Sequence, residues 1–340
     1  MTLKTPTVRL SVLDRSRTRR GRHPSRALRD TVAFARQAEA WGYHRFWVSE
    51  HHGVPGVAGS APTVLAAAVA AATSRIRVGT GGVMLPNHQP MVVAEQFGVL
   101  AALFPGRIDM GLGRSVAFTD GVRRALGRDK DAADYFAAQL TELLGYFTGE
   151  HPVHARPAEG LTVPAFVLAT GAGARVAAEA GLPLVIAAAR GERRMLEAID
   201  GYREHFRPSA WADRPYVIVS GTVAVADTAE AARELLVPEA WSTAYSRTHG
   251  EFPPLAPAEE IRALDMTSRE RTEFERAMTG HILGTEEEVA DGLGALIGRT
   301  EADEFLVTTS GYDREAVFGS YRRLAAMTSA TPNRTAADRR

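Results

Sequence analysis

The sequence contains no cysteine among its 340 residues. This absence excludes disulfide bonds, thiolate nucleophiles and zinc sites built on thiolates. An excess of either charge is also lacking, because 40 Lys and Arg residues balance 40 Asp and Glu residues. A chain without net charge has no global field to attract nucleic acid or an anionic membrane, so we expect neither as a partner.

Long apolar runs are missing as well. The longest candidate for a membrane span, residues 61–79, is rich in alanine and meets Arg75 before it is long enough to cross a bilayer. The start of the chain, MTLKTPTVRLSVLD, lacks the apolar segment of a signal peptide. With 45% hydrophobic residues the chain can bury a sizeable core. We therefore expect a cytoplasmic enzyme.

Apolar, β-rich runs alternate with helical patterns along the whole chain. Eight βα units in one series, with no interdomain linker, favour a (β/α)8 TIM barrel over two Rossmann halves. We expect one domain over residues 1–330 and a polar tail, 331–340, that frays. The expected strands are 8–14, 45–49, 76–81, 107–113, 165–169, 183–187, 216–225 and 304–309. The expected helices are 25–41, 62–73, 91–103, 132–147, 173–180, 192–206, 228–236, 286–299 and 313–326.

Two stretches are longer than a barrel requires. Residues 116–164 follow the fourth strand, and residues 238–283 lie between the seventh and eighth strands. Long loops over the active-site face of a barrel are usually lids or substrate walls. We expect both insertions to border the site.

The segment FWVSEHHGVPG, residues 46–56, places Glu50, His51 and His52 at the end of the second strand. Active sites of barrels form at the carboxyl ends of the strands. Adjacent side chains on extended backbone point to opposite faces, so one histidine should face a ligand and the other should support it. Metal-binding histidines on one element have a different spacing, as in HExxH, so we expect no metal. The alternative is two histidines that only hydrogen-bond at the start of a loop.

Glycines end the third strand in RVGTGGVMLPNHQP, residues 77–90. Without β-carbons, Gly79, Gly81 and Gly82 would let a flat ligand lie against the backbone. A simple tight turn explains the same residues.

The fourth and fifth strands end in groups that suit an anion. Arg114 and Ser115 follow the fourth strand, and an arginine fork holds a phosphate or carboxylate well. Thr170, Gly171 and Gly173 form a turn that leads into a helix, where backbone N–H groups can bind phosphate. Together these residues outline a phosphate clamp, and an ordinary surface ion pair is the alternative for Arg114.

Several of these motifs resemble the bacterial luciferase-like, FMN-dependent monooxygenase family, and most of all its single-component bacterial group. They are SEHHG, VGTGGVMLPNH, AEQFGVLAALFPGRIDMGLGRS, AAEAGLPLVIA and the C-terminal ILGTEEEVADGLGALIGRTEADEFLVTT. The resemblance implies a barrel that binds reduced FMN from a separate flavin reductase. It further implies reaction with O2 through a C4a-peroxyflavin to oxygenate a small organic substrate. The family commonly dimerises through helices around strands two to four, so we expect a homodimer.

The resemblance also assigns roles to residues. His51 matches the family's catalytic histidine and His52 its neighbour. We assign supporting roles to Glu50 and His52, and a second position at the mouth to His88. The remaining matches concern the cofactor. Gly81 and Gly82 match a pair, often joined by a cis peptide bond, that supports the isoalloxazine, and Arg114 with Ser115 matches the phosphate site. The second phosphate loop is matched by Thr170, Gly171 and Gly173.

The chain departs from the family pattern at two places. Only Thr170 supplies a hydroxyl in the second phosphate loop, which predicts weak retention of FMN. The first βα loop, from Arg15 to Arg22, is unusually basic and is either a solvated flexible loop or an attractor of anions at the mouth.

Three functions remain open from the sequence. A monooxygenase is favoured, and its substrate is left open. Lysine is scarce beside abundant arginine, which is typical of GC-rich genomes. In bacteria with such genomes these enzymes often serve secondary metabolism. The second is a reductase or dehydrogenase that uses FMN or a deazaflavin without O2. The third is a flavin-binding protein without catalysis.

Overall fold

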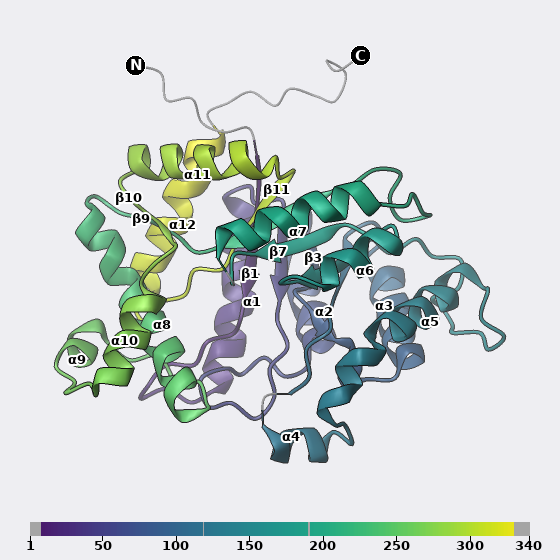
Figure 1. The fold of residues 1–340 in the computed structure, drawn as a ribbon, viewed down its shortest axis with the longest axis horizontal. Coiled ribbons are helices and arrows are strands. Elements are labelled where there is room, and N and C mark those ends of the chain that lie inside the picture. The colour runs from purple at the N-terminus through teal and green to yellow at the C-terminus, as the bar shows by residue number, and fades with distance from the viewer. Residues whose placement is uncertain (1–7, 118, 190, 330–340) are drawn as a thin grey trace.

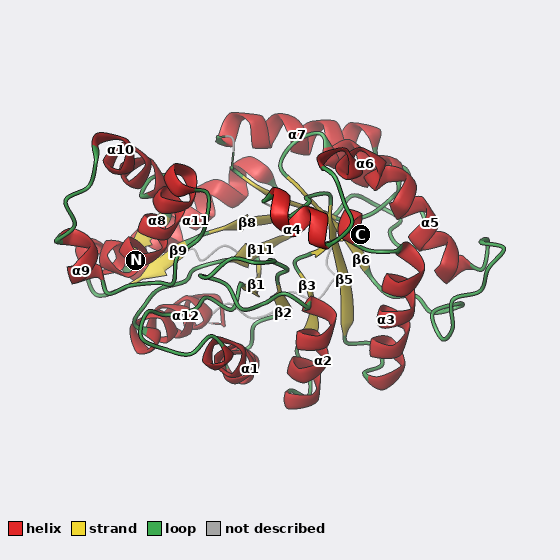
Figure 2. Cartoon of the chain, turned by 90° about the horizontal axis from the view of Figure 1, so that it is seen from below, coloured by secondary structure: helices red, strands yellow, loops and turns green. Residues whose placement is uncertain are grey.

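A parallel sheet closed on itself forms the centre of the molecule (Figures 1 and 2). The computed structural model describes residues 8–117, 119–189 and 191–329. Neighbouring strands pair in the order β3-β2-β1-β11-β8-β7-β6-β5-β4, and a pairing of β3 with β5 closes the ring. The predicted TIM barrel is therefore confirmed. The strands are β1 (Arg9–Asp14), β2 (Arg45–Val48), β3 (Arg77–Thr80), β4 (Val83–Met84), β5 (Ile108–Gly113), β6 (Ala165–Ala169), β7 (Leu184–Ala187), β8 (Val217–Gly221) and β11 (Glu304–Val307).

Helices surround the strands, and Figure 2 shows them around the sheet. In α1 the apolar residues Ala27, Phe34 and Ala38 recur at helical spacing and face the core. Proline opens both α2 and α3, where its missing N–H costs nothing. The outer helices are α1 (Ser25–Ala40), α2 (Pro62–Ala72), α3 (Pro90–Leu103), α5 (Phe136–Thr148), α6 (Gly173–Glu179), α7 (Glu192–His205), α11 (Glu286–Thr300) and α12 (Arg314–Ser329).

Buried charges fill the barrel at the amino ends of its strands. Arg45 Nη1 lies 2.8 Å from Asp109 Oδ2, and Arg45 Nε lies 2.8 Å from Glu304 Oε1. Both carboxylates have no exposed surface, and Arg77 also pairs with Asp109. Trp47 donates its indole N–H to Asp109 one layer further in. This network fills the barrel near the amino ends of its strands, so the space for a ligand lies toward their carboxyl ends.

Both expected insertions are present. After β5 come α4 (Asp120–Ala125), the short 3-10 helix η2 (Lys130–Tyr135) and α5; another short 3-10 helix, η1 (Leu85–Asn87), follows β4. Between β8 and β11 lie β9 (Val223–Val225), α8 (Ala229–His249), α9 (Ala258–Arg262), α10 (Ser268–Ala277) and β10 (Ile282–Gly284). Figure 1 shows α8, α9 and α10 together at one side of the barrel.

The prediction of one strand over residues 216–225 is wrong. The chain leaves the barrel after Gly221, and β9 pairs in parallel with β10 instead. The hydroxyl of Thr309 accepts from Val223 N–H and donates to Val223 C=O, which fixes the backbone where it turns away. The run of β-branched residues continues across this turn, so periodicity could not show the break.

Two helix boundaries also differ from the prediction. Helix α8 continues through Pro238 to His249, although proline in a helix interior is unfavourable. Its contacts with α10 and with the β9–β10 pair outweigh that local cost. The predicted helix over 132–147 begins instead as η2 and becomes α-helical only at Phe136.

Within the described part of the chain, no helix is long and apolar enough to cross a membrane. The tail predicted to fray, 331–340, lies outside the described residues.

Candidate functional site

A cavity of about 590 Å³ opens at the carboxyl ends of the barrel strands. Strands from all around the barrel contribute to its wall, which also includes Ser49, Leu168 and Ser220. The predicted site residues that line it are Glu50, His51, Gly81, Gly82, Arg114, Ser115, Thr170, Gly171 and Gly173. The structure thus brings the residues of strands two to five to one place.

The glycines after β3 belong to two different environments. Gly81 and Gly82, joined by a cis peptide bond, line the cavity. A β-carbon on Gly82 would lie 2.9 Å from Gly111 O, and one on Gly81 would lie 2.6 Å from a methyl of Leu13. At Gly79 a β-carbon would lie 2.3 Å from Asp109 O, inside the barrel. Close packing accounts for glycine at all three positions, and only Gly81 and Gly82 also line the cavity.

Donors for an anion gather at the side of the cavity formed by β5 and β6. Arg114 is 44% exposed, and its ion pair with the exposed Asp134 is long, at 3.7 Å. Its Cδ lies 4.0 Å from the position of a β-carbon on Gly173, so the guanidinium stem crosses the start of α6. No side chain caps that helix start, and Ser115 and Thr170 are exposed. A guanidinium, two hydroxyls and backbone N–H groups can together hold a phosphate.

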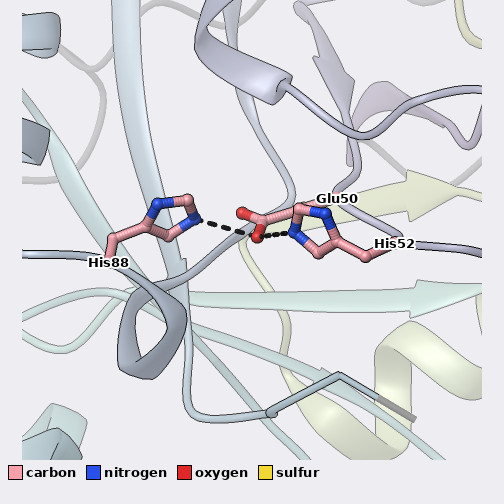
Figure 3. Close-up of side chains that lie close together, drawn as sticks. All are labelled: Glu50, His52 and His88. Carbon is pink, nitrogen blue, oxygen red and sulfur yellow. Dashed lines mark hydrogen bonds and ion pairs between the residues drawn. The ribbon is translucent and has the colours of Figure 1, made fainter. Parts of the chain in front are cut away.

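Glu50 organises the opposite side of the mouth. Its Oε1 lies 2.6 Å from His52 Nε2 and 2.9 Å from His88 Nε2, as Figure 3 shows. Its Oε2 accepts from the backbone N–H of Met84 at 2.9 Å. Burial opposes ionisation, but these hydrogen bonds outweigh it and lower the pKa of Glu50 to about 2. Glu50 is thus a permanent buried anion that orients two imidazoles.

His52 and His88 do not reach the cavity wall described above. His52 lies behind His51, as the alternation of side chains on extended backbone requires. His88 was predicted as a residue of the mouth; it instead turns to Glu50, and Arg128 holds its backbone carbonyl. The cause is the carboxylate, which offers a buried acceptor at 2.9 Å.

Glu50, His52 and His88 could also be read as metal ligands, because their ligand atoms lie within 4.8 Å of one another. Both imidazole Nε2 atoms point at the same carboxylate oxygen, so hydrogen bonds account for the arrangement without an ion. The expectation of no metal at these residues stays a prediction.

His51 lies on the cavity wall in a positive and partly buried environment. Its Nδ1 is 3.2 Å from Ser49 Oγ, its backbone N–H donates to Gly59 O, and its ring meets Phe252 edge-on. Burial lowers the pKa of His51 to about 4, and repulsion from Arg15 and Arg17 adds to the effect. The imidazole is therefore neutral at physiological pH and can accept a proton.

The first βα loop, for which a solvated segment and an attractor of anions were both left open, has two of its arginines bound to the second insertion. The side chain of Arg17 is only 3% exposed and its Nε lies 3.1 Å from Glu239 Oε2, while Arg15 Nη1 lies 2.9 Å from Glu239 Oε1. Further out, Arg20 pairs with Glu260. The basic loop is folded against the second insertion, because that insertion supplies its carboxylates.

Backbone hydrogen bonds join the same two segments. Thr18 N–H donates to Gly56 O, Gly56 N–H donates to Phe252 O, and Leu255 N–H donates to Thr18 O. The second insertion, which was expected to border the site, is thus docked on the loops after β1 and β2. No local pattern points to Glu239 or Phe252, which lie far along the chain from His51. The alternate spacing of Arg15 and Arg17 could have indicated a shared partner.

The family model of luciferase-like monooxygenases matches residues 8–302. The chain belongs to this family. It is 38% identical over 321 residues to the uncharacterized protein YvbT of Bacillus subtilis, covering 93% of this chain and 95% of that protein. It is 34% identical over 324 residues to a luciferase-like monooxygenase of Escherichia coli K12, with the same coverage. The solved structure of apo-MsnO8 has a TM-score of 0.86 at 32% identity and covers 96% of this chain and 100% of its own.

Relatives with a stated activity are oxidoreductases. An N-acetyl-S-alkylcysteine monooxygenase of Bacillus subtilis is 34% identical over 313 residues, covering 89% of this chain and 92% of that protein. Two remoter structures share the fold. The oxygenating constituent of 3,6-diketocamphane monooxygenase from Pseudomonas putida, in complex with FMN, has a TM-score of 0.69 at 19% identity, covering 95% of this chain and 98% of its own. An F420-dependent secondary alcohol dehydrogenase has a TM-score of 0.70 at 17% identity, covering 94% and 99%. The chain is accordingly an oxidoreductase of the luciferase-like family.

Histidine titration by NMR tests the electrostatics of His51. Its ring should remain neutral down to pH of about 4, with the signal assigned by His51→Gln. Because the folded pKa lies below the ordinary 6.5, the unfolded chain takes up the proton first, and this group should cost stability as pH falls from 6.5 to 4. Arg15→Gln should raise the midpoint and the exposed control Arg20→Gln should not. A midpoint near 6.5 in the unmodified protein would contradict the analysis.

Proposed function

We propose that this protein is a flavin-dependent monooxygenase that uses reduced FMN from a separate flavin reductase, and O2, to oxygenate a small organic substrate. One observation carries the proposal. A single cavity joins an anion-binding end at Arg114 to a neutral imidazole, His51, with bare glycine backbone between them. A phosphate tail, a flat ring and a proton acceptor need this order of groups.

The residues present fit FMN. The cavity wall at Gly81 and Gly82 carries no side chains, so a planar ring can approach the backbone. Arg114, Ser115, Thr170 and the uncapped start of α6 would hold the phosphate. This donor set contains one arginine that is 44% exposed, which agrees with weak retention of the cofactor.

Reduced FMN, when bound, would supply the two electrons needed for one atom of O2 to enter the substrate and the other to be reduced to water. His51, neutral and on the cavity wall, would accept or return a proton at its imidazole. Ser49 orients that ring through Nδ1, and Glu50 fixes the backbone of Met84 beside it. The docked insertion, with Phe252 against His51, would keep water from the reacting atoms.

The second candidate is a reductase or dehydrogenase that transfers hydride to or from FMN or a deazaflavin. Its support is the phosphate clamp, which would hold either cofactor equally well. The two candidates differ in their reaction with O2, and the following experiment separates them.

Stopped-flow absorbance tests the reaction. The protein is mixed with anaerobically reduced FMN and then with oxygenated buffer. We expect a near-ultraviolet transient that precedes the spectrum of oxidised FMN, because an enclosed site delays loss of the reactive species. In His51→Ala the transient should decay at least about 100-fold faster, the lower end of the range for a lost acid–base group. Direct formation of oxidised FMN, with or without substrate, would favour the reductase.

The phosphate clamp is tested by FMN affinity. Arg114→Ala should weaken binding by roughly 10-fold to 100-fold, the value of a charge-assisted hydrogen bond. Fluorescence quenching of FMN measures this directly. Arg175→Ala removes a nearby exposed arginine that pairs with Glu179 on α6, and it should leave the affinity unchanged. Equal affinity in the two variants would show that Arg114 does not bind the phosphate.

We further propose a homodimer formed through α2 and α3. Large apolar side chains are exposed on these two helices, at Val64, Val92, Val99 and Leu103. Soluble proteins seldom leave such a group uncovered.

Multi-angle light scattering checks the oligomeric state. The protein should have twice its chain mass at micromolar concentration, and Leu103→Glu should halve the measured mass, because burying a charge at a shared surface is unfavourable. Leu264→Glu, at an exposed leucine of the second insertion, is the control and should remain dimeric. A monomeric wild-type protein would overturn the proposal.

A further inference from the structure

The loop after β1 carries more positive charge at the mouth than its partners neutralise. Arg15 and Arg17 both pair with the single carboxylate of Glu239, at 2.9 and 3.1 Å. Burial opposes ionisation of Glu239, but the two arginines keep its pKa lowered, so it is an anion. Two cations and one anion leave one positive charge beside His51.

Neighbouring carboxylates are engaged elsewhere. Asp30 pairs with Arg314 at 3.1 Å, and Asp14 accepts from Ser16 N–H and lies in the field of Arg19 and Arg314. Glu50 serves the imidazoles and backbone described above. At His51 the effect of Arg15 and Arg17 exceeds that of Glu239 and Glu50, which acts in the opposite direction. The local field at this ring is therefore positive.

Arg15 is the member of the cluster that a ligand can reach. Its side chain is 25% exposed, against 3% for Arg17. Its Nη2 donates to Thr308 O and its Nη1 lies near Glu239, while its Nε is buried and has no hydrogen-bond partner among the described residues. The exposed quarter of the side chain, and not this buried Nε, is where an anionic ligand can approach.

The surroundings add an apolar surface to this charge. Arg17 lies over the ring of Phe252 with its guanidinium carbon 5.6 Å from the centroid, and His51 meets the same ring edge-on. Phe252 therefore stands between the basic pair and the imidazole. An acid with an apolar body matches this combination of cation and aromatic wall.

We propose that the substrate of this enzyme is an organic carboxylate whose anionic group is held by Arg15, next to His51. The proposal rests on the proposed function, since it takes the same cavity to be the place of reaction. Arg15 follows β1 whereas Arg114 follows β5, and β2 and β3 separate them in the sheet. The cavity wall includes His51 but not Arg15, so the carboxylate would bind at the edge of the cavity beside His51, apart from the phosphate of the cofactor at Arg114.

Binding of a matched pair of probes tests this without turnover. The FMN-loaded, oxidised protein is titrated with phenylacetate and with phenylacetamide, its neutral isostere, and binding is followed by calorimetry and by the flavin spectrum. The acid should bind roughly tenfold more tightly than the amide, as expected for a charge-assisted hydrogen bond. The acid should also raise the NMR titration midpoint of His51, and the amide should not.

Three variants locate the effect. Arg15→Gln should abolish the preference for the acid while leaving FMN affinity unchanged. Glu239→Gln should increase the preference, because it removes the competing anion, and a gain of this kind cannot come from misfolding. Arg20→Gln, an exposed arginine of the same loop, is the control and should behave like the wild-type protein.

Several outcomes would overturn the proposal. These are equal affinity for the two probes, no binding of either at millimolar concentration, and an Arg15→Gln variant that loses FMN and both probes together. The last result would place Arg15 at the cofactor. The binding titration consumes no O2, so its result does not depend on the stopped-flow test. A protein that prefers the acid but shows no stopped-flow transient would support the anion site and contradict the proposed monooxygenase function.

Discussion

The shape of this barrel depends on the interactions of one buried carboxylate, that of Asp109. Lying without exposed surface among the strands, it binds Arg45 and Trp47 from β2 and Arg77 from β3. Arg45 continues the network to Glu304 on β11. Removing one member of such a buried network leaves an uncompensated charge, which costs about 3–5 kcal/mol. The network therefore makes one end of the barrel solid and leaves the other end for chemistry.

The open end is organised by two further carboxylates on either side of His51. Glu50 accepts hydrogen bonds from two imidazoles and one backbone N–H, and these bonds hold the ends of the strands in place. Glu239 is shared by two arginines and does not balance them. Burial is the main reason why the ring of His51 is neutral, and the uncompensated positive charge of Arg15 and Arg17 adds to the effect.

Much of this arrangement could be predicted from local patterns. The eight strands follow from runs such as RFWV, which is buried throughout, and the division of labour between His51 and His52 follows from the alternation of side chains. Local patterns could not predict the features that depend on tertiary contacts. Pro238 lies inside a helix, and the strand expected across Thr222 breaks there because of hydrogen bonds from Thr309. The partners of His88 and Arg17 could not be predicted either, because each is bound by a carboxylate that only the fold brings near.

The docking of the first loop on the second insertion has a consequence for synthesis of the chain. Arg17 also donates to Ser242, 225 residues later in the sequence. While the ribosome has not yet made α8, this arginine has neither its carboxylate nor its hydroxyl partner and must remain hydrated. Contacts of such long sequence separation form late. The barrel strands up to β7 can associate during translation, but the wall beside His51 is completed only when most of the polypeptide has emerged.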